Sequence, residues 1–303
     1  MANPQPSAMF TDACAGNDQT LTAEKFLKQI NGIHELPTLS TISLQLGRKL
    51  QDINTSASDV AAIIQHDQSL VTKLLKLVNS AFFGFSNKVA SVQHALMLLG
   101  FNTVRNAVVS IDVINAMQIK NKIKGFDITS FWGHAIGVAV IGKYLDQEAG
   151  GSCREDIFTA GIIHDIGKLV MAHYFSDRFQ EVWETMHREQ LNFWEAEHRY
   201  FPLNHADIGA ELARRWHLPE IMQNVIGFHH TPAKSDTGDH LVHIIHTADA
   251  LFHVYMENDS PTEDWPIHST ARQLLRPLVK TAGKWMPDLV EDIKTASKML
   301  MED

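Results

Sequence analysis

Cysteine and long apolar runs are both scarce in this chain of 303 residues. Its two cysteines, Cys14 and Cys153, cannot build the disulfide framework of a small secreted domain, and their spacing is not that of a zinc knuckle. One of the longest apolar runs, residues 135–141, is far shorter than the roughly 20 residues that span a bilayer. No basic segment followed by an apolar core marks a secretory signal at the N-terminus. We therefore expect a cytoplasmic protein that does not associate with membranes.

The two-residue alternation of half-buried strands is also lacking, so a sheet is not expected. From residue 21 onward apolar residues recur at three- and four-residue spacing, which is typical of amphipathic helices. The sequence predicts an all-α fold: a disordered tail at 1–20, and a helical bundle at 21–124 packed on a second bundle at 125–303. Within the second bundle we expect helices over residues 154–175, from His205 onward, from Pro219 to His230, and over 241–255.

Positive charge is in short supply in the second half of the chain. Residues 126–303 carry 27 acidic and 15 basic residues, whereas residues 1–125 carry 8 and 11, for a net charge of −9. A nucleic-acid backbone usually requires a basic surface, so we expect no nucleic-acid partner. The acidic excess is equally well explained as an aid to solubility.

Histidine, by contrast, is abundant after residue 125, where 14 of the 17 histidines lie. They recur with aspartate in a fixed order: His134, His164-Asp165, His205, His229-His230 and Asp249. Imidazole and carboxylate together suit transition metals, and carboxylates can bridge a pair of ions. We predict a divalent metal centre with two ions, Fe or Mn favoured and Zn or Ni possible. The alternative is a set of ordinary histidines that bind no metal.

Helical geometry suggests how these residues would share two ions. Consecutive helical residues point about 100° apart, so His164 and Asp165 can straddle two centres with the Asp165 carboxylate as the bridge. His134, His164 and Asp249 would complete the coordination shell of one ion. His205, His229 and His230 would complete the shell of the other. Lys168, three residues after Asp165, can meet a phosphate oxygen. In an enzyme, Asp165 and Lys168 would be the catalytic residues.

Several strings resemble known families. His-Asp-Ile-Gly-Lys at 164–168 resembles the core of the HD superfamily of metal-dependent phosphohydrolases. Leu-Pro-Thr-Leu at 36–39, Asn-Ser-Ala-Phe-Phe-Gly at 79–84 and Trp-His-Leu-Pro at 216–219 resemble the HDOD (HD-related output domain) family. That resemblance implies an all-α bacterial signalling or output module, many relatives of which have lost metal ligands and act as non-catalytic regulators.

The ligand pattern itself is similar to that of the HD-GYP cyclic-dinucleotide phosphodiesterases. Residues 231–238 nevertheless contain no Gly-Tyr-Pro signature. The position four residues before His134 is Ser130, so an additional carboxylate ligand is not evident there. Two functions therefore stay open. One is a regulatory output module that contacts signalling proteins and has a covered pocket. The other is a metal-dependent phosphohydrolase or phosphodiesterase with an open cleft for a phosphorylated or cyclic-dinucleotide ligand.

Overall fold

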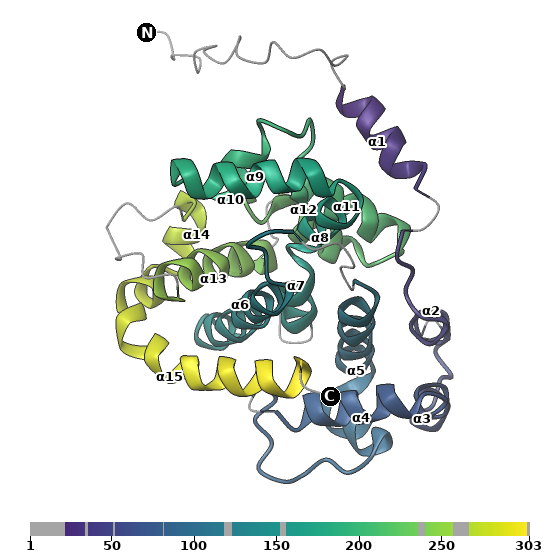
Figure 1. The fold of residues 1–303 in the computed structure, drawn as a ribbon. Helices are drawn as coiled ribbons and strands as arrows, with labels where there is room; N and C mark the ends of the chain where they lie inside the picture. The colour runs from purple at the N-terminus through teal and green to yellow at the C-terminus, as the bar shows by residue number, and fades with distance from the viewer. Residues whose placement is uncertain are drawn as a thin grey trace, which may run out of the picture.

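The structure is a computed structural model that describes residues 22–33, 36–50, 52–80, 82–117, 123–151, 156–235, 240–256 and 267–301. The tail predicted at 1–20 lies outside these ranges, as do both cysteines. The described residues form helices joined by short connections and contain no strand (Figure 1). The predicted all-α fold is therefore confirmed.

The first helices begin at polar caps. They are α1 (Ala23–Asn31), α2 (Thr41–Lys49), α3 (Ala57–Gln65), α4 (Gln68–Val78) and α5 (Val92–Ala116). A hydroxyl or carboxylate before each of them accepts a backbone N–H of the first turn, and the capping residues are Thr22, Ser40, Ser56, Asp67 and Ser91. Helices α2, α3, α4 and α5 pack on one another around apolar side chains such as Leu74 and Leu77.

Helix α5 is the one described helix whose length and composition would allow it to cross a membrane. Gly100 interrupts it with φ 80° and ψ 171°, a conformation that favours glycine. Of its most apolar window, 56% is buried inside the fold. A helix buried to this extent is typical of the core of a folded domain.

The remaining helices form the second half of the fold. They are α6 (Ile128–Glu148), α7 (Ile157–Ile163), α8 (Ile166–Tyr174), α9 (Ser176–Glu189), α10 (Phe193–Glu197), α11 (His205–Arg215), α12 (Glu220–Phe228), α13 (His240–Met256), α14 (Ser269–Leu274) and α15 (Arg276–Met301). Helix α7 packs on α6, α13 on both, α11 on α8, and α12 on α7, α11 and α13. The α7–α8 corner is therefore enclosed by α6, α11, α12 and α13.

The prediction of one helix over residues 154–175 is wrong, because the chain turns at His164 and Asp165 between α7 and α8. Asp165 has φ −98° and ψ 9°, and its carbonyl accepts the Lys168 N–H at 2.9 Å, a tight turn that starts α8. Periodicity could not show this break, because the residues of α7 are all buried and most of those in α8 are as well.

Contacts between the two predicted bundles are extensive. Phe26 of α1 packs against Phe175 and Phe201, with ring centroids 4.9 and 5.8 Å apart. The Trp216 indole donates to the Pro37 carbonyl at 2.7 Å. At the other end of the molecule, α15 runs across α6 and reaches α4 (Figure 1). One continuous apolar core results.

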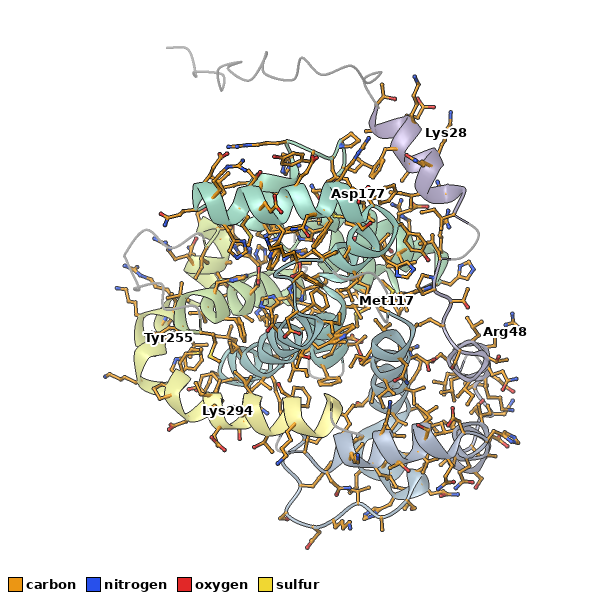
Figure 2. All side chains as sticks on the ribbon, in the orientation of Figure 1. Lys28, Arg48, Met117, Asp177, Tyr255 and Lys294 are labelled. Atoms are coloured by element: carbon orange, nitrogen blue, oxygen red, sulfur yellow. The ribbon has the colours of Figure 1, made fainter. Side chains whose placement is uncertain are left out.

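The charged side chains of α1, α2 and α15 point away from that core. Lys28, Arg48 and Lys294 are labelled examples in Figure 2, and all three are exposed. The predicted bundle boundary at residues 124 and 125 lies next to residues 118–122, which the structure does not describe.

Candidate metal centre

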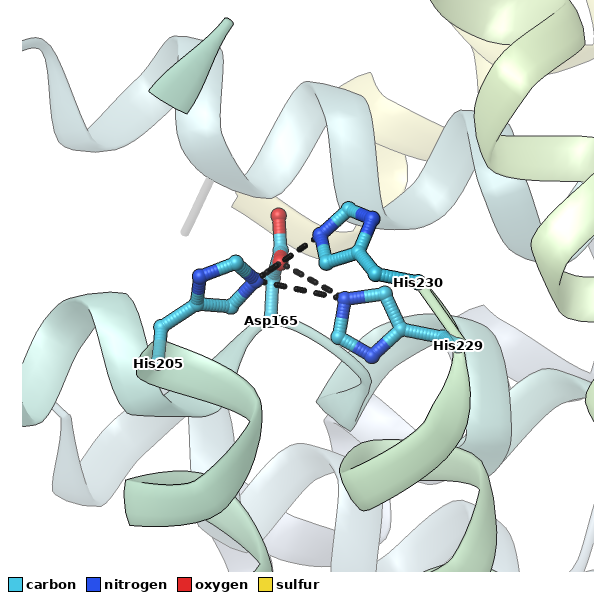
Figure 3. A group of neighbouring side chains, drawn as sticks. All are labelled: Asp165, His205, His229 and His230. Carbon is cyan, nitrogen blue, oxygen red and sulfur yellow. Dashed lines mark hydrogen bonds and ion pairs between the residues drawn. The ribbon is translucent and has the colours of Figure 1, made fainter. Parts of the chain in front are cut away.

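The α7–α8 corner brings Asp165 together with histidines from α11 and the end of α12. Asp165, His205, His229 and His230, here called the inner set, place their ligand atoms within 4.8 Å of one another (Figure 3). His205 is the first residue of α11, and His229 follows the last residue of α12. Each histidine therefore stands at a helix end, where its side chain can turn into the gap between the helices.

Distances within the inner set match those around a metal ion. Asp165 Oδ1 lies 3.1 Å from His205 Nε2 and 3.5 Å from His229 Nε2. His205 Nε2 lies 3.3 Å from His229 Nε2 and 3.0 Å from His230 Nε2. Atoms that share an ion at about 2.1 Å are roughly 3.0 to 3.4 Å apart in octahedral or tetrahedral geometry. The inner set therefore has the spacing of a coordination shell.

A second group, the outer set, consists of Asp165 with His134, His164 and Asp249. His134 Nε2 lies 3.2 Å from His164 Nε2, 3.5 Å from Asp165 Oδ2 and 3.3 Å from Asp249 Oδ1. The two oxygens of Asp165 thus face different sets, Oδ1 the inner and Oδ2 the outer. The structure brings together all the residues that the sequence analysis predicted as metal ligands. Metal binding by these residues stays a prediction.

Hydrogen bonds at the far side of the rings orient the histidines. The Nδ1 atoms of His164 and His229 donate to the carbonyls of Gly161 and Ile226, each at 2.8 Å. A carbonyl oxygen only accepts, so these bonds fix the proton on Nδ1 and leave the Nε2 lone pair facing the cluster. Metal-binding histidines are held by partners of this kind.

Buried acceptor atoms that make no hydrogen bond point to the same conclusion. Asp165 Oδ1 and Asp249 Oδ1 are buried and make no hydrogen bond in the described part of the chain. A buried acceptor oxygen without a hydrogen bond is costly, and coordination to a metal would satisfy it. Together with the converging imidazoles, these oxygens form a donor set that fits a divalent metal.

Burial also sets the protonation of the cluster. It lowers the pKa of His164 to about 3, and the pKa of His230 also falls, through burial and then the neighbouring His229. At His205 burial acts in the same direction but is outweighed, chiefly by the Glu197 carboxylate, and the pKa rises to about 9. His164 and His230 are therefore neutral at pH 7, the form that binds metal, whereas His205 must release a proton to bind one.

Lys168 is turned toward Asp165 rather than toward solvent. Its Nζ lies 2.6 Å from Asp165 Oδ2 and 5.1 Å from the centroid of the Phe193 ring. Despite burial, which opposes it, the lysine charge holds the pKa of Asp165 well below its usual range. Lys168 thus keeps the shared carboxylate ionised, and its assignment to catalysis stays a prediction.

Two residues that the sequence analysis missed complete the surroundings. Both oxygens of the fully buried Glu197 accept from His205, from its backbone N–H and from Nδ1, each at 2.8 Å. His253 Nε2 lies 3.3 Å from Asp249 Oδ1, four residues away on α13. The four-residue spacing could have indicated His253, whereas no local signal sets Glu197 apart from the other acidic residues of the second half.

Comparison of the sequence with known protein families identifies a match over most of the chain. The model of the HDOD domain matches residues 36–232, about two thirds of the chain. The chain belongs to the HDOD family. The predicted resemblance to HDOD proteins is thus confirmed, and the structurally similar proteins share its fold.

Solved structures and a curated protein are similar to this chain over most of its length. An HDOD domain protein of unknown function from Geobacter sulfurreducens is 23% identical, with a TM-score of 0.75 over 91% of this chain and 97% of that one. A candidate phosphohydrolase from Shewanella amazonensis is also 23% identical, with a TM-score of 0.69 over 90% and 97%. An uncharacterized protein of Treponema pallidum is 26% identical over 82% of this chain, which spans only 48% of that protein.

Proposed function

We propose that this HDOD protein is a regulatory output module built around a dinuclear metal centre. The observation that carries the proposal is the convergence of the inner and outer sets on the two oxygens of Asp165. One divalent ion would be held by the inner set and one by the outer set, with Asp165 between them. Fe and Mn suit this mixture of imidazole and carboxylate, and Zn or Ni can use it as well.

Burial favours regulation over turnover at the inner position. The side chains of His205 and His229 are 0% exposed, and that of Asp165 is 2% exposed. The ligands come from α6, the α7–α8 corner, α11, α12 and α13, so metal binding would fix the relative positions of these helices. The outer surface of that assembly would then contact signalling proteins of the bacterial cytoplasm.

A second candidate is a metal-dependent phosphohydrolase or phosphodiesterase. It is favoured by the outer set, whose His134 side chain is 12% exposed, and by the ammonium of Lys168 beside Asp165. Divalent ions supply Lewis-acid chemistry for phosphate esters. In that case Lys168 would compensate the charge of a phosphorylated or cyclic-dinucleotide ligand, and Asp165 would hold the reacting centre.

Metal analysis of purified variants tests the centre. Asp165→Ala should lose metal from both positions, because its two oxygens face different sets. Asp249→Asn should lose metal from the outer position alone, and Asp177→Asn, an exposed control on α9, should match the unmodified protein. Circular dichroism would confirm that each variant is folded. Full metal content in folded Asp165→Ala would contradict the bridging role.

Activity separates the two candidate functions. Metal-loaded protein should be incubated with cyclic-di-GMP and with a generic phosphodiester, beside the Asp165→Ala variant. We expect little or no turnover, since rate depends on holding the phosphate in line and the Gly-Tyr-Pro loop of the related phosphodiesterases is missing. Robust turnover that disappears in the variant would replace the regulatory function with an enzymatic one.

A further inference from the structure

His253 adds an imidazole to the solvent side of the outer set. We propose that His253 is a further ligand at the outer position, where it would bind the ion together with His134 and Asp249 at the open edge of the metal centre. The inference rests on the proposed metal centre, but it concerns a residue outside the predicted ligand order. The ligand class is a borderline divalent cation such as Mn²⁺, which accepts mixed imidazole and carboxylate donors.

Asp249 is the centre of this position. Its Oδ1 lies 3.3 Å from His134 Nε2 and 3.3 Å from His253 Nε2, so two imidazole nitrogens approach the same oxygen. That oxygen is buried and makes no hydrogen bond within the described residues. The three ligand atoms lie within 4.8 Å of one another. The separations are those of atoms around a shared ion, about 3.0 to 3.4 Å.

The helix places these groups without strain. Asp249 and His253 are four residues apart on α13, and residues at that spacing share a helix face. His134 comes from α6, which packs directly on α13. The His134 and His253 rings lie 4.9 Å apart at an interplanar angle of 35°. Phe252 packs edge-on against the His134 ring at 4.8 Å and holds it toward α13.

Exposure distinguishes this position from the rest of the centre. The His253 side chain is 41% exposed, compared with 12% for His134 and 8% for Asp249. A cation bound there would reach water on its open side and complete its shell with solvent. It would therefore exchange faster than an ion at the inner set. An ordinary ion pair between protonated His253 and Asp249 is the competing explanation.

Titration with Mn²⁺ distinguishes a ligand from an ion pair. Chelator-treated protein would be titrated with Mn²⁺ alone, and the free ion counted by electron paramagnetic resonance. His253→Gln should weaken the most weakly bound Mn²⁺ at least about tenfold and leave the tightest unchanged, as expected for loss of one ligand. His253→Glu, which keeps a metal-binding group, should stay within about threefold of the unmodified protein. His187→Gln, an exposed histidine on α9, is the control.

The possible results separate the two proposals. Unchanged binding in both His253 variants would overturn the role of His253 while leaving the proposed centre intact. Equal weakening in His253→Gln and His253→Glu would overturn it as well, because a substitute ligand should rescue binding. If the unmodified protein binds no Mn²⁺, or if Asp165→Ala binds as much, the centre itself fails and the inference falls with it.

Discussion

Glu197 shows how a single buried carboxylate can orient a predicted metal ligand. It is fully buried, and both of its oxygens are used by His205. The bond to Nδ1 orients the ring so that Nε2 faces Asp165, and the bond to the backbone N–H satisfies a donor of the first turn of α11. Glu197 would therefore be a positioning residue that acts on a bound metal through His205.

We expect Glu197→Gln to weaken the tightest metal site about 10- to 100-fold, which is typical of such supporting partners. The amide keeps the size of the side chain but removes the charge that raises the pKa of His205. Isothermal titration with Mn²⁺ would measure the change, with the exposed Glu184→Gln as the matched control. Unchanged affinity would show that the Glu197 charge is dispensable.

The meeting of α8 and α11 is the element-level feature that makes the inner set possible. A Cβ added to Gly167 would lie 1.8 Å from the His205 carbonyl oxygen, so the two helices approach more closely than any other residue would permit. This contact joins the start of α8, next to Asp165, to the start of α11. The glycine of the His-Asp-Ile-Gly-Lys string is therefore required by packing.

Replacing Gly167 with alanine should destabilise the protein by about 1–3 kcal/mol or more, because overpacking against backbone forces the helices apart. Gly133→Ala is the matched control, since an added Cβ there meets nothing within 4 Å and alanine favours the helix. Urea denaturation of both variants would measure the difference. Equal stability of the two would mean that α8 and α11 can separate without cost.

Local chemistry explains which elements the sequence could predict. The caps at Thr22 and Asp67 and the break at Gly100 are local signals, and the structure has all three. The corner at His164 and Asp165 depends on packing from α6 and α11, far away in the chain, so periodicity within 154–175 could not reveal it. For the same reason the ordered histidines indicated a cluster, but not Glu197 behind His205.

At the scale of the whole molecule, a polar network joins α5 to α7, the helix that precedes His164. Asn106 Nδ2 donates to Asp156 Oδ1 at 2.8 Å, and the Thr159 hydroxyl donates to the Asn106 carbonyl at 2.8 Å. Ser110 Oγ lies 3.0 Å from Thr159 Oγ1. These bonds tie α5 to α7, whose last residue, Ile163, directly precedes His164. A displacement of α5 would therefore be transmitted to α7.

Stability should depend on pH in the metal-free protein. Burial lowers the pKa of His164 to about 3 and that of His246 to about 4, from an ordinary value of 6.5. Below pH 6.5 the unfolded chain takes up protons that the folded chain resists, so stability should fall as the pH drops from 6.5 toward 4. His205, with its raised pKa of about 9, contributes stability that is present below pH 6.5 and is lost as the pH rises toward 9.

Urea midpoints of chelator-treated protein at pH 5, 7 and 9 would measure both trends. We expect the highest midpoint near pH 7. A midpoint that rises toward pH 5 would show that the buried imidazoles are protonated in the folded state.

In a chain with few cysteines, bound metal could supply the cross-links that disulfides supply in other proteins. Paired ligands such as His134 and His164, or His205 and His229, are 30 and 24 residues apart. A covalent cross-link that closes a loop of that length contributes about 3.5 kcal/mol by restricting the unfolded chain. Coordinate bonds to a shared ion would act as cross-links of this kind. They would be broken by protonation of the ligands or by a chelator. The stability of the architecture would thus respond to the supply of metal.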